Sequence, residues 1–108
     1  MNQRQPAYRS TAMREAVRDL ACTLKIPGIC QSTPASEAAH LNCQWAGKGM
    51  GYKSADVVAA ACHWCHAEID SGKTLSREDR EYYLMRGVIL THIALLNEGR
   101  LVLAKPRR

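Results

Sequence analysis

Five cysteines are the residues of this 108-residue chain whose type and spacing point most directly to chemistry. Cys62 and Cys65 form a C-x2-C pair, and Cys22 and Cys30 stand on either side of a Pro-Gly turn. A structural zinc ion takes four soft ligands in a tetrahedron, and thiolates are its preferred donors. The turn can bring Cys22 and Cys30 to the same ion as the C-x2-C pair. The sequence therefore predicts a structural Zn²⁺ held by these four cysteines.

Two other uses of the cysteines compete with zinc binding. Disulfide bonds form in oxidising compartments, but the polar, basic N-terminal stretch lacks the apolar segment of a secretory signal. We therefore expect a cytoplasmic protein of a bacterial host, whose thiols stay reduced. A C-x2-C pair also serves as a redox motif, although no strand leads into it at the start of an α/β unit. The odd count fits four ligands plus Cys43, which we expect to be a small buried hydrophobe.

The elements that must position the cysteines predict an α+β fold with a zinc-stabilised core. Apolar residues at helical spacing predict a helix over residues 11–21, capped by Ser10 or Thr11. Residues 37–41 and 56–61 are expected to form two strands of a hairpin, joined through an irregular glycine-rich loop at residues 47–54. A short helix should follow over residues 62–70 and end near the next Ser-Gly pair.

A long C-terminal helix completes the expected fold. It should start at Ser76, because the residues that follow resemble a capping box with acids in the first turn, and it should end at Gly99. Its expected buried stripe comprises Leu84, Val88, Thr91 and Leu95, with Ile89, His92 and Leu96 as neighbours. Residues 23–26 are expected to be extended and residues 101–103 to form a small strand. We expect residues 1–9 to be a flexible N-terminus and residues 10–108 to form one domain.

Four polar side chains should gather around the hairpin and the helix that follows it. His40 lies near the end of the first strand, and Asp56 begins the second. His66 follows the C-x2-C pair directly, and Asp70 stands four residues later on the same helix face. A β-hairpin followed by a helix that carries a metal ligand is the ββα-metal arrangement of HNH nucleases. Their chemistry needs a histidine to deprotonate water and a divalent ion to stabilise charge on phosphate.

The order of these motifs resembles the small phage and prophage family typified by YbcO. The resemblance covers about residues 20–72, half of the chain, and rests on four motifs, Cys-Thr-Leu-Lys-Ile-Pro-Gly-Ile-Cys at 22–30, Ala-His-Leu at 39–41, Gly-Lys-Gly-Met-Gly at 47–51 and Ala-Cys-His-Trp-Cys-His-Ala-Glu-Ile-Asp at 61–70. That family is regarded as HNH-like and related to the phage recombination nucleases Ref and Rap. The resemblance implies a metal-dependent endonuclease that hydrolyses DNA phosphodiester bonds during recombination.

The resemblance also implies roles for the four polar residues. His40 would be the general base and His66 a ligand of a catalytic Mg²⁺ or Mn²⁺ ion, whose coordination Asp70 would complete. Asp56 would stand where the motif's central Asn braces the hairpin. Ala39 replaces an Asp or His that binds metal in many HNH enzymes, so either water fills the missing positions, as Mg²⁺ accepts, or activity has been lost.

Structural roles compete with each of these functional ones. His40 alone is more typical of a satisfied structural histidine. His66 can replace a cysteine as a zinc ligand, because zinc accepts imidazole. Asp70 can simply pair with Lys73 on the surface.

Net charge is +5, with basic residues concentrated at both ends of the chain. Such a charge suits a polyanion such as DNA, and equally suits a solvated surface. The candidate phosphate contacts are Lys48, Lys53, Arg14 and Arg18. A phosphate-loop pattern is missing from the glycine-rich stretch, and no apolar run reaches the ~20 residues that span a bilayer. The competing functions are a non-catalytic zinc-stabilised DNA-binding or recombination accessory module, and a protein-interaction adaptor.

Overall fold

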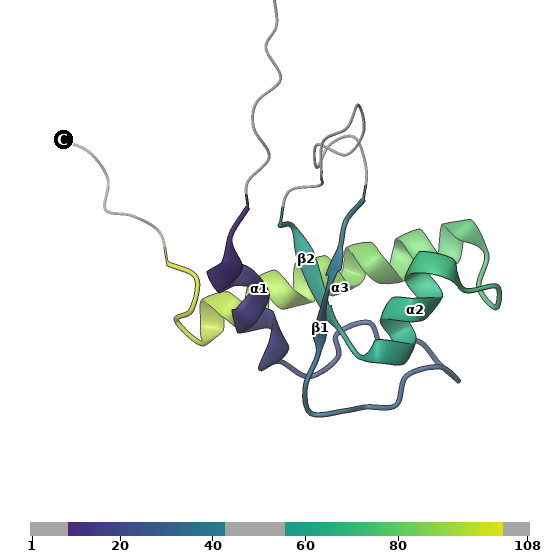
Figure 1. Cartoon of the computed structure of the whole chain (residues 1–108), viewed down its shortest axis with the longest axis horizontal. Helices are drawn as coiled ribbons and strands as arrows, with labels where there is room; N and C mark the ends of the chain where they lie inside the picture. Colours follow the sequence, from purple (N-terminus) through teal and green to yellow (C-terminus); the bar gives the residue numbers. More distant parts are fainter. Residues whose placement is uncertain (1–8, 43–55, 103–108) are drawn as a thin grey trace, which may run out of the picture.

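A computed structural model describes residues 9–42 and 56–102 of the chain. The elements run in the order α1 (Thr11–Arg18), β1 (Glu37–His40), β2 (Val58–Ala61), α2 (His63–Ser71) and α3 (Arg77–Asn97). The expected α+β fold is therefore confirmed (Figure 1). The glycine-rich loop, Cys43, Lys48, Lys53 and the expected flexible N-terminus, except for residue 9, lie outside the described residues. Within the described ranges, no helix is long and apolar enough to cross a membrane.

The ends of the helices follow local sequence signals. Ser10 caps α1 by accepting a hydrogen bond from the Met13 backbone N–H at 3.1 Å. Ser76 caps α3 in the same way, accepting from the Asp79 N–H at 3.0 Å. Gly99 follows the end of α3 with a φ of +71°, the left-handed conformation that glycine adopts without steric cost. These expected boundaries are confirmed because each depends on residues within a few positions of one another.

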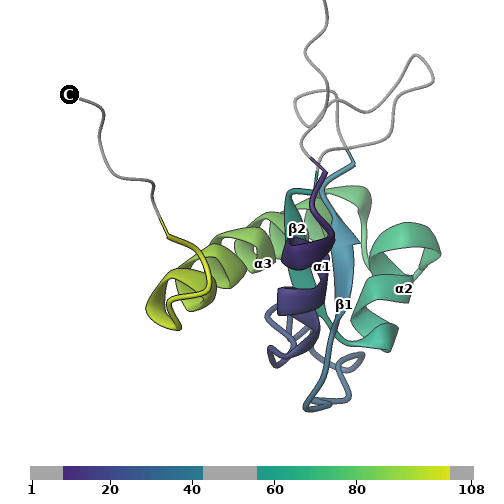
Figure 2. The ribbon, with the colours of Figure 1, turned by 60° about the vertical axis from the view of Figure 1, so that its left-hand side comes forward.

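The hairpin has a small-residue surface that lets other segments pack close on both sides. β1 and β2 pair antiparallel, from Glu37 opposite Ala61 to His40 opposite Val58. Alternate residues of a strand point to opposite faces, so Ala39 packs with the cysteine cluster and α2, whereas Ala38 packs with α1. Two turned views show the hairpin between α1 and α2, with α3 running along its β2 side (Figures 1 and 2).

Two threonines cover the outer edge of β2 and attach it to α3. The Ala60 carbonyl accepts a hydrogen bond from the Thr23 N–H at 2.7 Å, and the Ala60 N–H donates to Thr91 Oγ1 at 2.9 Å. An unpaired strand edge exposes such backbone groups, so their pairing protects the hairpin. Gly87 permits this approach, because a Cβ there would lie 2.5 Å from Cδ1 of the fully buried Leu24.

Several sequence expectations about α3 and the short segments are wrong. The buried residues of α3 are Leu84, Gly87, Thr91 and Leu95, whereas Ile89, His92 and Leu96 are exposed. A helix turns about 100° per residue, which puts Ile89 and Leu96 nearly opposite the buried stripe.

The other corrections concern chain segments outside the helices. Residues 23–26 are not extended throughout, because Lys25 adopts a φ of +49°. β2 begins at Val58, two residues after Asp56, and residues 101–102 are not a strand. The first helix ends at Arg18 rather than near residue 21, although Leu20 beyond it is still buried.

Candidate functional site

Four cysteines form one cluster between the residue 22–30 segment and the start of α2. The ligand atoms of Cys22, Cys30, Cys62 and Cys65 all lie within 4.8 Å of one another. Cys62 caps α2 and Cys65 lies in its first turn, while the Cys30 N–H donates to the Ile26 carbonyl at 2.9 Å across the expected Pro-Gly turn. The expected convergence of the two pairs is confirmed. Cys43 lies outside the described residues.

The spacing of the sulfur atoms fits a tetrahedral metal site. Zn–S bonds of about 2.3 Å place neighbouring sulfur atoms about 3.8 Å apart in a tetrahedron. The Sγ atoms of Cys30 and Cys62 are 4.0 Å apart, and the other sulfurs are at comparable separations, within 4.8 Å. Four converging thiols with this spacing are consistent with a structural zinc site.

The thiols of the cluster differ in how readily they ionise. Burial raises the pKa of Cys22 and of Cys65 above the ordinary value. Burial also acts against the Cys62 thiolate, but hydrogen bonds, chiefly from the Gln31 and Cys65 backbone N–H groups, outweigh it and lower the pKa to about 7. A metal ion at this position would compensate for the burial of several thiolates, which bind metal only after losing their protons.

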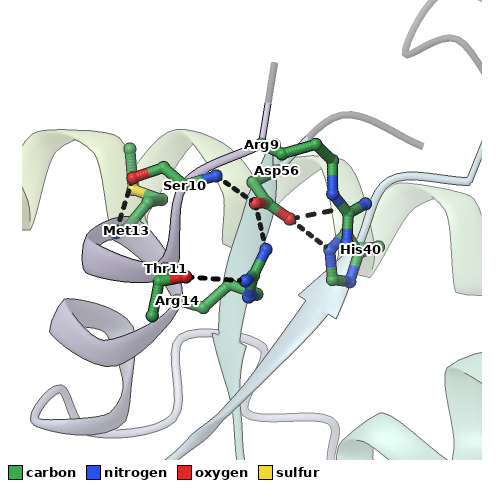
Figure 3. A network of polar contacts seen from close by, with 7 residues as sticks. All are labelled: Arg9, Ser10, Thr11, Met13, Arg14, His40 and Asp56. Atoms are coloured by element: carbon green, nitrogen blue, oxygen red, sulfur yellow. Dashed lines mark hydrogen bonds and ion pairs between the residues drawn. The ribbon is translucent and has the colours of Figure 1, made fainter. Parts of the chain in front are cut away.

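His40 and Asp56 form a close pair at the open end of the hairpin. His40 Nε2 lies 2.8 Å from Asp56 Oδ1, although sixteen residues separate the two. The Asp56 side chain is fully buried and is surrounded by the start of α1 (Figure 3). The Ser10 N–H donates to Asp56 Oδ2 at 2.5 Å, the Arg14 guanidinium contacts the same oxygen, and Arg9 lies 3.7 Å from Oδ1.

This environment keeps the buried carboxylate charged. Burial raises the pKa of Asp56, but the hydrogen bond from Ser10, the contact with His40 and the charges of Arg9 and Arg14 outweigh it and lower the pKa overall. A charged Asp56 accepts a hydrogen bond and has no proton to donate. His40 Nε2 therefore donates to Asp56, which in a neutral imidazole leaves the lone pair on Nδ1.

Asp56→Asn is expected to lower the free energy of unfolding at neutral pH by about 1.5–3 kcal/mol, because charge-assisted hydrogen bonds are lost. A lowered folded-state pKa gives a stability contribution that is present above the ordinary value of 3.8 and disappears as the pH falls through the folded value. The difference between wild type and variant should therefore shrink as the pH falls below 3.8. Urea unfolding over a pH series measures it.

Asp19→Asn serves as a matched control, since exposed Asp19 pairs with exposed Arg100 at 2.9 Å. Exposed pairs contribute about 0–1 kcal/mol, so this variant should stay close to wild type. Protonation of the cysteine cluster in acid, with loss of any metal bound there, would affect all three proteins alike. A constant gap between wild type and Asp56→Asn at every pH would contradict the predicted role of Asp56.

His66 is held between two carboxylates on the other face of the hairpin. Its Nδ1 lies 2.7 Å from Glu37 Oε1, and its Nε2 lies 3.3 Å from Asp70 Oδ2. Glu37 also reaches His63 Nδ1 at 3.2 Å through its second oxygen. The sequence analysis missed Glu37, although strand alternation places it on the same face as Ala39, towards α2.

Carboxylates contact both ring nitrogens of His66. A ligating histidine commonly donates its other ring N–H to a carboxylate, which fixes the tautomer. With Glu37 accepting from Nδ1–H, Nε2 is the ring nitrogen that faces Asp70 Oδ2, to which it donates when the imidazole is charged. The contacts of His66 are thus with Glu37 and Asp70, whereas those of His40 are with Asp56.

One cavity is lined by His40 and Asp70 but by neither Asp56 nor His66. A hollow of about 340 Å³ is lined by His40, Asn42, Ile69, Asp70, Arg77, Arg80, Glu81 and Leu84. His40 comes from β1 and Asp70 from α2, so the proposed base and one proposed metal ligand face the same space. Two arginines from the start of α3 also line it, where Arg77 pairs with Glu81 at 3.6 Å and Arg80 donates to the Gly72 carbonyl at 2.6 Å.

Two of the expected phosphate contacts lie within the described residues. Arg14 contacts Asp56 and Thr11, and the Asp56 carboxylate neutralises its charge. Arg18 lies exposed in the last turn of α1. Arg77 and Arg80, which the sequence analysis did not select, are closer to the cavity.

Comparisons by sequence and by structure both match this chain to phage-related proteins. The family described as "Putative nuclease YbcO" matches residues 11–100. Proteins of that name from Escherichia coli K12 and from Enterobacteria phage 82 are each 40% identical over 92 residues, covering 81% of this chain and 93% of the relative. The solved structure of a "putative bacteriophage protein" from E. coli K-12 matches with a TM-score of 0.66 and 28% identity, covering 82% of this chain and all of the other.

Proposed function

Because the chain belongs to the YbcO family, we propose that it is a metal-dependent endonuclease that hydrolyses DNA phosphodiester bonds. The phage origin of a relative supports a place in phage or prophage DNA metabolism, and we propose recombination as the process served. The observation that carries the proposal is the shared cavity, which His40 and Asp70 enter from opposite elements. The hairpin and the following helix have the order of the HNH motif, and we propose that relationship too.

His40 is the proposed general base. Asp56 accepts from Nε2, so Nδ1 is the atom that would take a proton from water attacking the phosphorus. Arg9, Arg14 and the Ser10 N–H hold the carboxylate in place, so that the imidazole keeps one tautomer. The side chain of His40 is 25% exposed, which leaves the ring open to solvent and substrate.

His66 Nε2 and Asp70 are the proposed ligands of a catalytic Mg²⁺ or Mn²⁺ ion. Their 3.3 Å separation suits two donors on one ion, and Ala39 supplies none, so water would complete the coordination. When bound, such an ion neutralises charge that develops on the phosphate oxygens. Glu37 would keep Nδ1 protonated and thereby hold the Nε2 lone pair towards the ion.

The remaining parts of the proposal concern substrate and scaffold. Arg77 and Arg80 would contact phosphates near the cavity, and Arg18, Lys48 and Lys53 would do so farther along the DNA. Zinc is the proposed ion at the four cysteines, where it would brace the segment 22–30 against α2.

A plasmid-nicking assay with Mg²⁺ or Mn²⁺ tests the proposed function. The zinc-loaded chain should convert supercoiled DNA to open-circular DNA only when the divalent ion is added. Asp70→Ala should reduce the rate at least ~100-fold, because a positioned metal contributes several kcal/mol to transition-state stabilisation. Asp19→Ala, which removes an exposed acid at the end of α1, should cleave at the wild-type rate. DNA binding without cleavage under every ion would instead support the accessory module.

A further inference from the structure

The outer face of α3 carries a continuous row of exposed apolar side chains. Its members are between 42% and 60% exposed and comprise Tyr82, Met85, Ile89, Ile93 and Leu96, called the outer stripe below. At 100° per residue, these positions fall within a narrow arc of the helix. The buried residues Leu84, Thr91 and Leu95 lie on the opposite side, against the hairpin. The outer stripe therefore faces away from the core of its own chain.

A helix with apolar residues on two opposite faces is typical of one that is covered on both. Single exposed apolar residues are ordinary, but a contiguous row marks an interaction site. The stripe runs from Tyr82 to Leu96, fourteen steps along the helix or about 21 Å at 1.5 Å per residue. That length suits packing against another helix.

The spacing of the outer stripe is symmetric about Ile89. Met85 and Ile93 lie four residues on either side of it, and Tyr82 and Leu96 lie seven residues on either side. In a two-fold interface each contact occurs twice, so residue i meets j and residue j meets i. An antiparallel pair of identical helices meets that requirement only if the contact positions are symmetric about the axis. The outer stripe has this symmetry.

We propose that α3 packs against α3 of a second copy of this chain, antiparallel, with the two-fold axis at Ile89. In this register Ile89 meets the partner's Ile89, Met85 meets the partner's Ile93, and Tyr82 meets the partner's Leu96. The dimer is independent of the proposed nuclease activity, because no outer-stripe residue lines the cavity.

An antiparallel pair also suits the dipoles of the two helices. Two parallel helices place their like-charged ends side by side, whereas antiparallel helices place opposite ends together.

The apolar area is sufficient for a stable dimer. With about 200 Å² for a large side chain, five half-exposed residues offer on the order of 500 Å². A standard interface buries about 800 Å² per partner, and in homodimers roughly 65% of it, or about 500 Å², is apolar. The outer stripe alone accounts for that share.

Sedimentation equilibrium of the zinc-loaded full chain tests the proposal. The wild type should be dimeric, and Ile89→Glu should weaken association at least ~100-fold, because two buried acids would meet at the axis. Trp64→Glu, which places the same charge at an exposed apolar position of α2, should remain dimeric. Circular dichroism and zinc content should be unchanged in both variants. A monomeric wild type, or a dimer that tolerates Ile89→Glu, would overturn the proposal.

A charge pair tests the register. Met85→Glu and Ile93→Lys should each weaken the dimer when made alone. Together they should restore much of the association, in a salt-sensitive manner, because the introduced acid of one protomer meets the introduced amine of the other. A double variant weaker than either single variant would indicate a parallel pair and would overturn the antiparallel arrangement.

Discussion

Cys65→Ser is expected to abolish cooperative folding of the whole chain. Cys65 is fully buried, and its sulfur belongs to the four-cysteine cluster that joins the segment 22–30 to α2. The binding free energy of structural zinc, about 10–16 kcal/mol in small zinc domains, is also folding free energy. It is comparable to the ~5–15 kcal/mol by which most domains are stable. Thermal unfolding followed by circular dichroism, with metal content by mass spectrometry, measures both losses.

Cys43→Ser is the matched control, because it removes the fifth cysteine by the same chemical change. This variant should keep one zinc ion per chain and a wild-type melting temperature. Chelation of zinc from the wild type should reproduce the unfolding seen in Cys65→Ser, and added zinc should reverse it. Full zinc occupancy and wild-type melting in Cys65→Ser would remove Cys65 from the proposed ligand set.

Much of the fold could be predicted because its signals are local. Ser10 and Ser76 cap helices whose first turns follow at once, and Gly99 ends α3 through its own backbone conformation. The two cysteine pairs each lie within nine residues, so only their meeting depended on tertiary structure. Other features of the fold depend on contacts between residues far apart in the sequence. Pairing of β2 with Thr23 and Thr91 involves residues 37 and 31 positions away and has no local signal.

The errors in α3 came from its two apolar faces. Leu84, Val88 and Leu95 mark one stripe, while Ile89, Ile93 and Leu96 mark another, and residue type alone does not show which one meets the core. Gly87 distinguishes the buried face of α3 from the exposed one. Its lack of a Cβ allows Leu24 and Ala59 to approach, so the side of the helix that carries Gly87 packs against the hairpin.

The candidate site was predictable in part for the same reason. His40 and Asp56 flank one hairpin, so their proximity followed from strand pairing. Glu37 could have been found by carrying the alternation back from Ala39 to the face that looks towards α2. The role of Arg14 could not have been predicted, because its contact with Asp56 spans 42 residues and depends on how α1 packs against the hairpin.

His40→Ala is expected to reduce metal-dependent DNA cleavage by about 10²–10⁴-fold, the usual contribution of a general base. The fold should survive, because His40 is only half-buried at the end of β1 and Arg14 still neutralises Asp56. DNA affinity, zinc content and the melting temperature should stay near wild type, so the loss should appear in kcat. Rates of plasmid nicking at saturating Mg²⁺ or Mn²⁺, together with DNA binding by anisotropy, separate the two effects.

His92→Ala provides the comparison, since His92 is an exposed histidine of α3 that does not line the cavity shared by His40 and Asp70. It should cleave at the wild-type rate. Asp56→Asn should slow cleavage without weakening DNA binding, because an amide at that position no longer holds the His40 tautomer by charge. If His40→Ala cleaves as fast as His92→Ala, another group must activate water. The buried Asp56 network would then serve only to attach α1 to the hairpin.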